Sequence, residues 1–136
     1  MLNYAYLWAH EAALGQEDGV KDRPAVVVLS VESQNGETVI SVCPVTSQTP
    51  EDMRTAVQMP PQVKNHLGLT DRPASYIVTT EINRFVWPGP DIRPFERNGR
   101  MDIFHGQIPA KLFDIVRNSL IDNIRAHRHA ATSRST

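Results

Sequence analysis

The chain lacks the features on which several protein classes depend. Its 136 residues include one cysteine, Cys43, so no disulfide within the chain can support the fold. No apolar run approaches the roughly 20 residues that a membrane-spanning helix needs. The first 14 residues place no basic leader before their apolar side chains, so we expect no signal peptide. These absences favour a cytoplasmic protein, and the length suits one domain.

Basic residues are not in excess, which argues against nucleic-acid binding over a broad surface. The 14 Lys and Arg face 15 Asp and Glu, for a net charge of −1. Residues 125–136 hold three Arg and no acid, so the remainder carries 11 basic and 15 acidic residues, or −4. Proteins that bind the phosphate backbone usually show a basic surface. Any RNA site must therefore be a local basic pocket.

Apolar residues, 40% of the chain, fall mainly into short runs typical of strands. The patterns predict strands at 4–8, 25–31, 37–45, 75–80, 84–87 and 102–107. The sequence Asn35-Gly36 favours positive φ at both positions, as a tight hairpin turn requires, so 25–45 is predicted to be a β-hairpin. The polar segments 11–22 and 48–72 are predicted loops, apart from a possible short helix at 63–67 that ends at Gly68.

An amphipathic helix is the last predicted element. Pro109 suits the first position of a helix, and apolar residues then recur at helical spacing. These residues are Leu112, Phe113, Val116, Leu120 and Ile124. Residues 126–136 are small and polar and are predicted to form a disordered tail, which leaves 1–125 as the domain. Short strands without β-α-β alternation predict a mainly β, α+β fold: a small antiparallel β-barrel with a C-terminal helix packed against it.

Two polar segments flank the predicted hairpin. Pro24 favours an extended Arg23 at the start of one strand, and Thr46 and Ser47 follow the end of the partner strand. An antiparallel pair brings a strand start and a strand end to the same rim. A guanidinium beside two hydroxyls is a plausible phosphate site, since it can donate two parallel hydrogen bonds. Taken alone, an exposed strand-edge Arg and ordinary turn-forming Thr and Ser fit the same residues.

Three other groups are weaker candidates for chemistry. His10, close to Trp8, is a candidate base, although the sequence favours the alternative of an ordinary surface histidine at the start of a loop. Asn83, Arg84 and Trp87 could hydrogen-bond and stack a splayed RNA base. The alternative is a core Trp87 with a solvated Arg84. Cys43 lies in an apolar strand and is expected to be a buried, inert thiol. No cluster of metal ligands appears.

Taken in order, the motifs resemble the MazF/PemK (Kid-like) toxin family of type II toxin–antitoxin systems. Arg23-Pro24 opens a hydrophobic strand, and Pro44-Val45-Thr46-Ser47 follows at a spacing similar to the family's. Residues 75–87 are similar to the family's later strand. Gly106-Gln107-Ile108-Pro109 resembles its entry into the final helix. The segment 49–74 has no clear counterpart.

The resemblance implies a fold and a set of partners. The fold would be an SH3-like antiparallel β-barrel with a C-terminal helix, as in MazF, PemK and CcdB. The protein would be a homodimer that cleaves single-stranded RNA without a metal or cofactor. Its partner would be a cognate antitoxin with a disordered C-terminal segment, and it would contact operator DNA only through that antitoxin. No membrane is implied.

The same resemblance implies roles for particular residues. The ribose 2′-hydroxyl would attack its own phosphate and leave a 2′,3′-cyclic phosphate. Arg23 would stabilise the phosphorane or protonate the leaving oxygen, while Thr46 with Ser47 would position a phosphate oxygen. The general base stays open. Family members place it on the later strand, or in the loop before Arg-Pro, where Glu17 is the nearest match.

On the later strand the expected acid position holds Thr80, with Glu81 beside it. Neighbouring residues of a strand point to opposite faces, so Glu81 could replace the acid only if a bulge re-aimed it. This keeps a second hypothesis open. The chain could be a non-enzymatic protein of the same fold, either a CcdB-like inhibitor of a protein target or a regulatory module that binds DNA or antitoxin.

Overall fold

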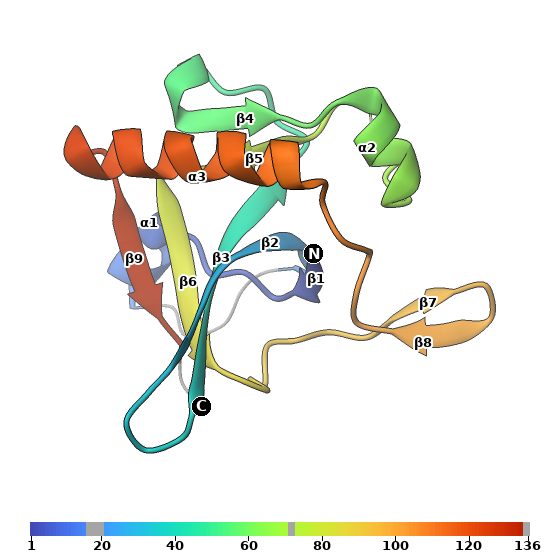
Figure 1. Ribbon diagram of the computed structural model, residues 1–136, viewed down its shortest axis with the longest axis horizontal. Helices are drawn as coiled ribbons and strands as arrows, with labels where there is room; N and C mark the ends of the chain where they lie inside the picture. Colours follow the sequence, from blue (N-terminus) through green and yellow to red (C-terminus); the bar gives the residue numbers. More distant parts are fainter. Residues whose placement is uncertain (16–20, 71–72, 135–136) are drawn as a thin grey trace.

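The computed structural model describes residues 1–15, 21–70 and 73–134. The elements of these residues, in chain order, are β1 (Leu2–Tyr4), α1 (Ala9–Ala13), β2 (Arg23–Glu32), β3 (Thr38–Thr46), the 3-10 helix η1 (Met53–Thr55), β4 (Ala56–Gln58), α2 (Pro61–His66), β5 (Tyr76–Val78), β6 (Glu81–Val86), β7 (Phe95–Arg97), β8 (Arg100–Asp102), α3 (Ala110–Arg125) and β9 (Ala130–Ser133). The fold is mixed α+β and mostly sheet, with α3 lying across one face (Figure 1). In these ranges, no helix has the length and apolar character needed to cross a membrane.

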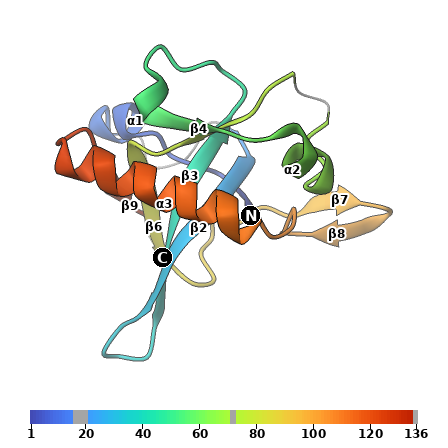
Figure 2. The ribbon, with the colours of Figure 1, turned by 45° about the horizontal axis from the view of Figure 1, so that its top comes forward.

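Strand β3 is the centre of the main sheet. One edge of β3 pairs with β2, and its other edge pairs first with β6 and then, at the C-terminal end, with β5. β1 extends the sheet beyond β2, β4 extends it beyond β5, and β9 extends it beyond β6. β7 and β8 form a separate two-stranded hairpin, and the tip of β2–β3 projects from the body as a second arm (Figure 2).

The predicted hairpin over 25–45 is confirmed, but its turn differs from the prediction. β2 and β3 pair in antiparallel register from Ala25–Pro44 to Glu32–Thr38. Of the two turn residues, only Gly36 has a positive φ, of 83°. The Gly36 N–H donates to the Ser33 carbonyl at 3.1 Å, and the Ser33 N–H donates to the Glu37 carbonyl at 2.7 Å. These bonds close a longer loop around one left-handed glycine instead of a two-residue turn.

Two apolar clusters cover the two faces of the sheet. On one face, α3 buries Leu112, Val116 and Leu120 over the strands, as the helical spacing predicts. Ile124 departs from that stripe and is 53% exposed. Pro109 is the N-cap residue, so the helix begins one residue later than predicted. On the other face, an aromatic cluster contains Tyr4, Tyr6 and Phe85.

The sheet is open where a closed barrel was expected. In the described part of the chain, the outer strands β1 and β4 do not pair with each other. The predicted strand at 4–8 is also shifted: β1 ends at Tyr4, and the chain turns into α1 because Glu81 and Glu11 accept hydrogen bonds from its first N–H groups. The predicted strand at 102–107 reduces to β8 and an isolated bridge between Phe104 and Leu2.

The C-terminal segment differs most from expectation, because residues 130–133 form a strand and not a disordered tail. β9 pairs in parallel with β6. Arg134 follows and is 7% exposed; its guanidinium forms a 2.8 Å ion pair with Asp91 and donates to the Ala5 carbonyl at 2.7 Å and to Asn83 Oδ1 at 3.1 Å. A small, polar sequence is therefore ordered by backbone pairing and one buried cation.

Replacing Arg134 with methionine should lower the free energy of unfolding by about 3–5 kcal/mol, because the Asp91 carboxylate then stays buried without this cation. Urea denaturation measures the change. The matched control is Arg125→Met at the exposed end of α3, which should change stability by less than about 0.5 kcal/mol. Equal stability of the two variants would show that the buried contacts of Arg134 do not support the fold.

Candidate functional site

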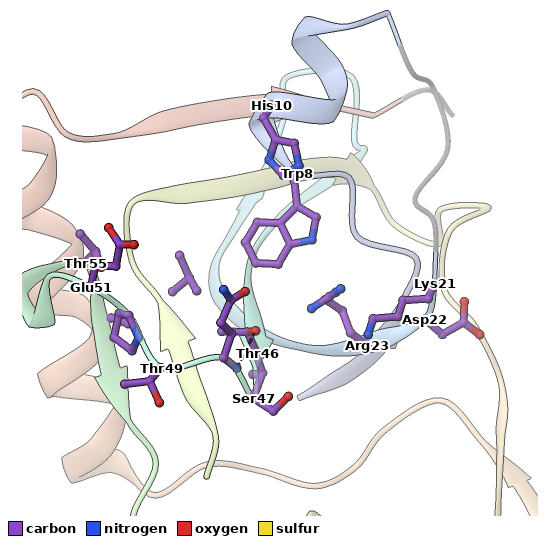
Figure 3. Close-up of a pocket in the computed structure, with 15 residues that line it drawn as sticks. Trp8, His10, Lys21, Asp22, Arg23, Thr46, Ser47, Thr49, Glu51 and Thr55 are labelled. Atoms are coloured by element: carbon purple, nitrogen blue, oxygen red, sulfur yellow. Dashed lines mark hydrogen bonds between the residues drawn. The ribbon is translucent and has the colours of Figure 1, made fainter. Parts of the chain in front are cut away.

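The two polar segments that flank the hairpin meet at one of its ends. Ala25 pairs with Pro44, so Arg23 and Thr46, each two residues further along, reach the same rim. With Ser47 they line a cavity of about 750 Å³, within the roughly 300–1,000 Å³ typical of ligand pockets. Figure 3 shows Arg23 on one side of the floor and the two hydroxyl residues beside it. The structure thus brings three of the predicted catalytic residues together.

Arg23 is held at the rim by its backbone and by an aromatic ring. It is the first residue of β2, where it pairs with Tyr4, and Pro24 favours its extended backbone. Its guanidinium carbon lies 4.9 Å from the ring centroid of Trp8, a cation–π distance. Arginine is charged at all physiological pH values, so this half-buried group can donate two hydrogen bonds to a phosphate in the cavity.

Thr46 and Ser47 add hydroxyl groups beside this cation. Thr46 Oγ1 accepts a hydrogen bond from the Gln48 N–H at 3.2 Å, which turns the chain at the end of β3. The same hydroxyl can still donate its own proton, for example to a phosphate oxygen. Ser47 is exposed at the cavity. The rim therefore combines one fixed positive charge with two neutral donors, which suits a phosphodiester.

Trp8 and His10 form one wall of the cavity, and a buried asparagine holds that wall. Asn83 of β6 is fully buried. Its Nδ2 donates to the Leu7 carbonyl at 2.8 Å, and its Oδ1 accepts from the Leu7 N–H at 2.9 Å. This double contact fixes the chain directly before Trp8. The rings of Trp8 and His10 lie 24° apart in orientation, with centroids separated by 6.5 Å.

Glu81 supports the same wall but does not face the cavity. Its Oε1 accepts hydrogen bonds from the Ala9 N–H at 2.9 Å and from the Tyr6 hydroxyl at 3.1 Å. Burial raises the pKa of Glu81, and these two hydrogen bonds oppose the rise. Among the described residues that line the cavity, neither Glu81 nor Thr80 is present. The later strand therefore places no base beside Arg23.

The residues expected to bind an RNA base do not assemble at the cavity. Asn83 is buried and bonded to backbone groups, while Arg84 is exposed on the opposite face of β6. Trp87 is 36% exposed and stacks on Phe104 with ring centroids 6.2 Å apart. None of the three is among the described lining residues. Glu17, the remaining predicted catalytic residue, lies outside the described residues.

The wall opposite Trp8 comes from Gln48 and residues 49–55, and the latter belong to the segment without a counterpart in the resemblance. Glu51 and Thr55 line the cavity there, and Figure 3 shows them across the cavity from the indole. Glu51 is exposed, so its carboxylate can meet a ligand. Sequence reasoning missed this acid. Its position four residues after Ser47 was the available signal, because a short loop after a strand stays near that strand's end.

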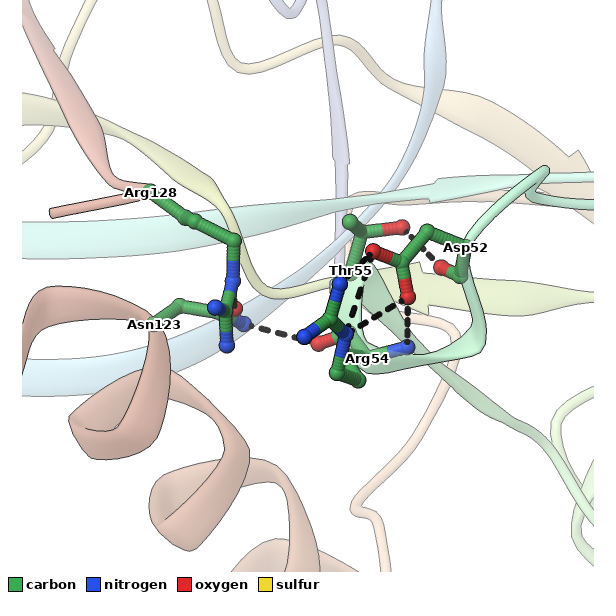
Figure 4. A network of polar contacts seen from close by, with 5 residues as sticks. All are labelled: Asp52, Arg54, Thr55, Asn123 and Arg128. Atoms are coloured by element: carbon green, nitrogen blue, oxygen red, sulfur yellow. Dashed lines mark hydrogen bonds and ion pairs between the residues drawn. The ribbon is translucent and has the colours of Figure 1, made fainter. Parts of the chain in front are cut away.

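A second buried asparagine fixes this wall to α3 (Figure 4). Asn123 Nδ2 donates to the Arg54 carbonyl at 3.0 Å and to the Thr79 carbonyl at 3.2 Å, while its Oδ1 accepts from Arg128 Nε at 2.9 Å. Asp52 caps η1 by accepting from the Arg54 N–H at 2.9 Å. Hydrogen bonds from the Arg54 side chain and backbone lower the pKa of Asp52 to about 2. The loop that carries Glu51 is therefore anchored at its base.

Comparison with known proteins assigns no family. The chain matches no protein-family model, and comparison with curated proteins and with solved structures finds no match. In the described residues, no group of three or more His, Cys, Asp or Glu side chains is placed to hold a metal ion. Function is therefore inferred from the side chains of the cavity and from the sequence motifs that lead to them.

Changing Asn123 to alanine should lower the free energy of unfolding by about 2–4 kcal/mol, because the Arg54 and Thr79 carbonyls lose this donor. Asn118→Ala, at an exposed position of the same helix, is the matched control and should change stability by less than about 0.5 kcal/mol. Chemical denaturation of both variants measures the difference. Similar unfolding midpoints for the two would contradict the anchoring role of Asn123.

Proposed function

We propose that the chain is a metal-independent endoribonuclease of the MazF/PemK type, the toxin of a type II toxin–antitoxin pair. The observation that carries the proposal is the meeting of Arg23, Thr46 and Ser47 in one cavity, with Trp8 as its wall. A cation with hydroxyl donors fits a phosphodiester, and an aromatic wall offers a stacking surface to an unpaired base. Single-stranded RNA carries a phosphodiester and an unpaired base next to each other, so it can occupy both parts of the cavity.

The proposed reaction depends mainly on stabilising the negative charge that develops on the phosphate. When the ribose 2′-oxygen bonds to phosphorus, negative charge grows on the non-bridging oxygens of the phosphorane. Arg23 lies where its guanidinium can bind those oxygens, and Thr46 can donate a further hydrogen bond. The bond to the 5′-oxygen then breaks and leaves a 2′,3′-cyclic phosphate. The cation–π contact with Trp8 holds Arg23 ready before the substrate binds.

We also propose that the fold is an open variant of the SH3-like barrel shared by MazF, PemK and CcdB. The order of the β2–β3 hairpin, the β6 strand and the C-terminal α3 supports this reading. The protein would act as a homodimer and bind a disordered antitoxin segment over the cavity. Exposed apolar side chains on the β2 arm, Leu29 at 55% and Val31 at 48%, supply surface that a partner would cover.

A binding protein without catalysis remains the second candidate, for one specific reason. Thr80 occupies the expected acid position, and Glu81 is engaged at the start of α1. A silent member of the fold would keep the phosphate-binding rim and lose turnover. It would bind single-stranded RNA, a protein target or an antitoxin without breaking a bond. RNA cleavage therefore separates the two candidates directly.

The purified protein should cleave a mixed single-stranded RNA in EDTA and leave 2′,3′-cyclic phosphate ends, detected by gel and by mass spectrometry. Arg23→Ala should slow cleavage by about 10²–10³-fold, as expected for the loss of a group that stabilises developing charge. Arg100→Ala, at an exposed position of β8, is the control and should cleave at the wild-type rate. Expression of wild type, but not of Arg23→Ala, should arrest growth. RNA that stays intact with the wild-type protein would favour the binding protein.

A further inference from the structure

The reaction proposed above requires a base for the 2′-hydroxyl and an acid for the leaving 5′-oxygen. Apart from Arg23, the titratable side chains in the described lining of the cavity are His10, Lys21, Asp22 and Glu51. Asp22 Oδ1 forms a 3.6 Å ion pair with Arg93 Nε, and Figure 3 shows the Asp22 carboxylate pointing away from Trp8. Lys21 adds positive charge on the Arg23 side. His10 and Glu51 remain, and both are side-chain types that commonly act as a general acid or a general base.

These two groups lie on opposite walls (Figure 3). His10 extends from α1 above Trp8, at the top of the wall that Asn83 holds in place. Glu51 extends from the segment between β3 and η1 on the far side. Arg23 and Thr46 line the same cavity, and Figure 3 shows Thr46 below the indole, with Glu51 on one side of it and Arg23 on the other. An in-line displacement puts the attacking and the leaving oxygen on opposite sides of the phosphorus, so a group on each wall can serve one of them.

Both side chains are exposed, yet neither depends on a flexible terminus for its position. The Ala9 N–H, directly before His10, is bonded to Glu81. The backbone beyond Glu51 is fixed by the cap of η1 and by the bond from Asn123 to Arg54. Each group therefore sits on a short segment anchored in the body and projects into an open cavity, which an RNA strand can enter.

We propose that Glu51 is the general base and His10 the general acid of the RNA-cleavage reaction. The inference rests on the proposed nuclease function. The Glu51 carboxylate takes the proton of the 2′-hydroxyl as the 2′-oxygen forms its bond to phosphorus. The protonated His10 ring gives its proton to the 5′-oxygen as the bond between phosphorus and that oxygen breaks. No water, metal or redox partner enters this step. At its end Glu51 has gained the proton of the 2′-hydroxyl, and His10 has lost its proton to the 5′-oxygen.

The pair lies among charged groups that come from several elements of the fold. The charged groups near the pair are Glu11 and Glu81 beside His10, Asp52, Arg54 and Arg128 on the side of Glu51, and Lys21 and Arg23 on the side of the cavity away from Glu51. Burial raises the pKa of Glu81, and the charge of His10 opposes this rise, so the two groups interact.

The pH–rate profile of wild-type cleavage should be bell-shaped, rising as Glu51 loses its proton and falling as His10 loses its own. Glu51→Gln and His10→Gln should each slow cleavage by about 10²-fold or more. Glu51→Gln should also remove the rising limb, and His10→Gln the falling limb. Controls are Glu32→Gln and His66→Gln, which change exposed residues away from the cavity and should keep the wild-type profile.

An RNA with sulfur in place of the bridging 5′-oxygen separates the two roles, because a thiolate leaves without a proton. On this substrate His10→Gln should recover to within about threefold of wild type, while Glu51→Gln should stay slow. If wild type cleaves, Arg23→Ala does not, and both glutamine variants keep the wild-type rate and profile, the acid–base pair is wrong and the nuclease stands. If wild type does not cleave, the proposed function itself fails.

Discussion

The structure depends on one constraint: irregular backbone that crosses a core must find hydrogen-bond partners there. Two fully buried asparagines meet this need, Asn83 for the chain before Trp8 and Asn123 for the loop that carries Glu51. An asparagine amide has both a donor and an acceptor, so it can pair with a backbone much as a strand does. Each wall of the cavity is fixed by one of these side chains.

The cavity walls matter because the affinity for phosphate must come from local side chains and not from the net charge of the chain. A chain with net charge −1 has no broad attraction for phosphate, so its affinity must come from directed groups. Arg23 is such a group: its guanidinium lies against the Trp8 ring, next to the hydroxyls of Thr46 and Ser47. A fixed cation in a cavity loses little conformational entropy on binding, which partly offsets the weak long-range field.

The C-terminal segment helps to hold this arrangement in place. Arg134 donates to Asn83 Oδ1 and to the Ala5 carbonyl while it pairs with Asp91, so one buried cation joins β9, β6 and the N-terminal chain. The same Asn83 oxygen accepts from Leu7, directly before Trp8. The position of the cavity wall is thus coupled to residues more than a hundred positions away in the sequence. A disordered tail could not contribute in this way.

Local pattern by itself determined the hairpin of β2 and β3, the buried stripe of α3, and the meeting of Arg23 with Thr46, because strand and helix periodicity act over neighbouring residues. Tertiary structure decided the rest. β9 has no apolar signal and forms because β6 offers an unpaired edge and Asp91 attracts Arg134. Glu81, which could act as the base only if a bulge re-aimed it, instead supports α1, and Glu51 lines the cavity. Both outcomes follow from contacts between distant segments that no local pattern encodes.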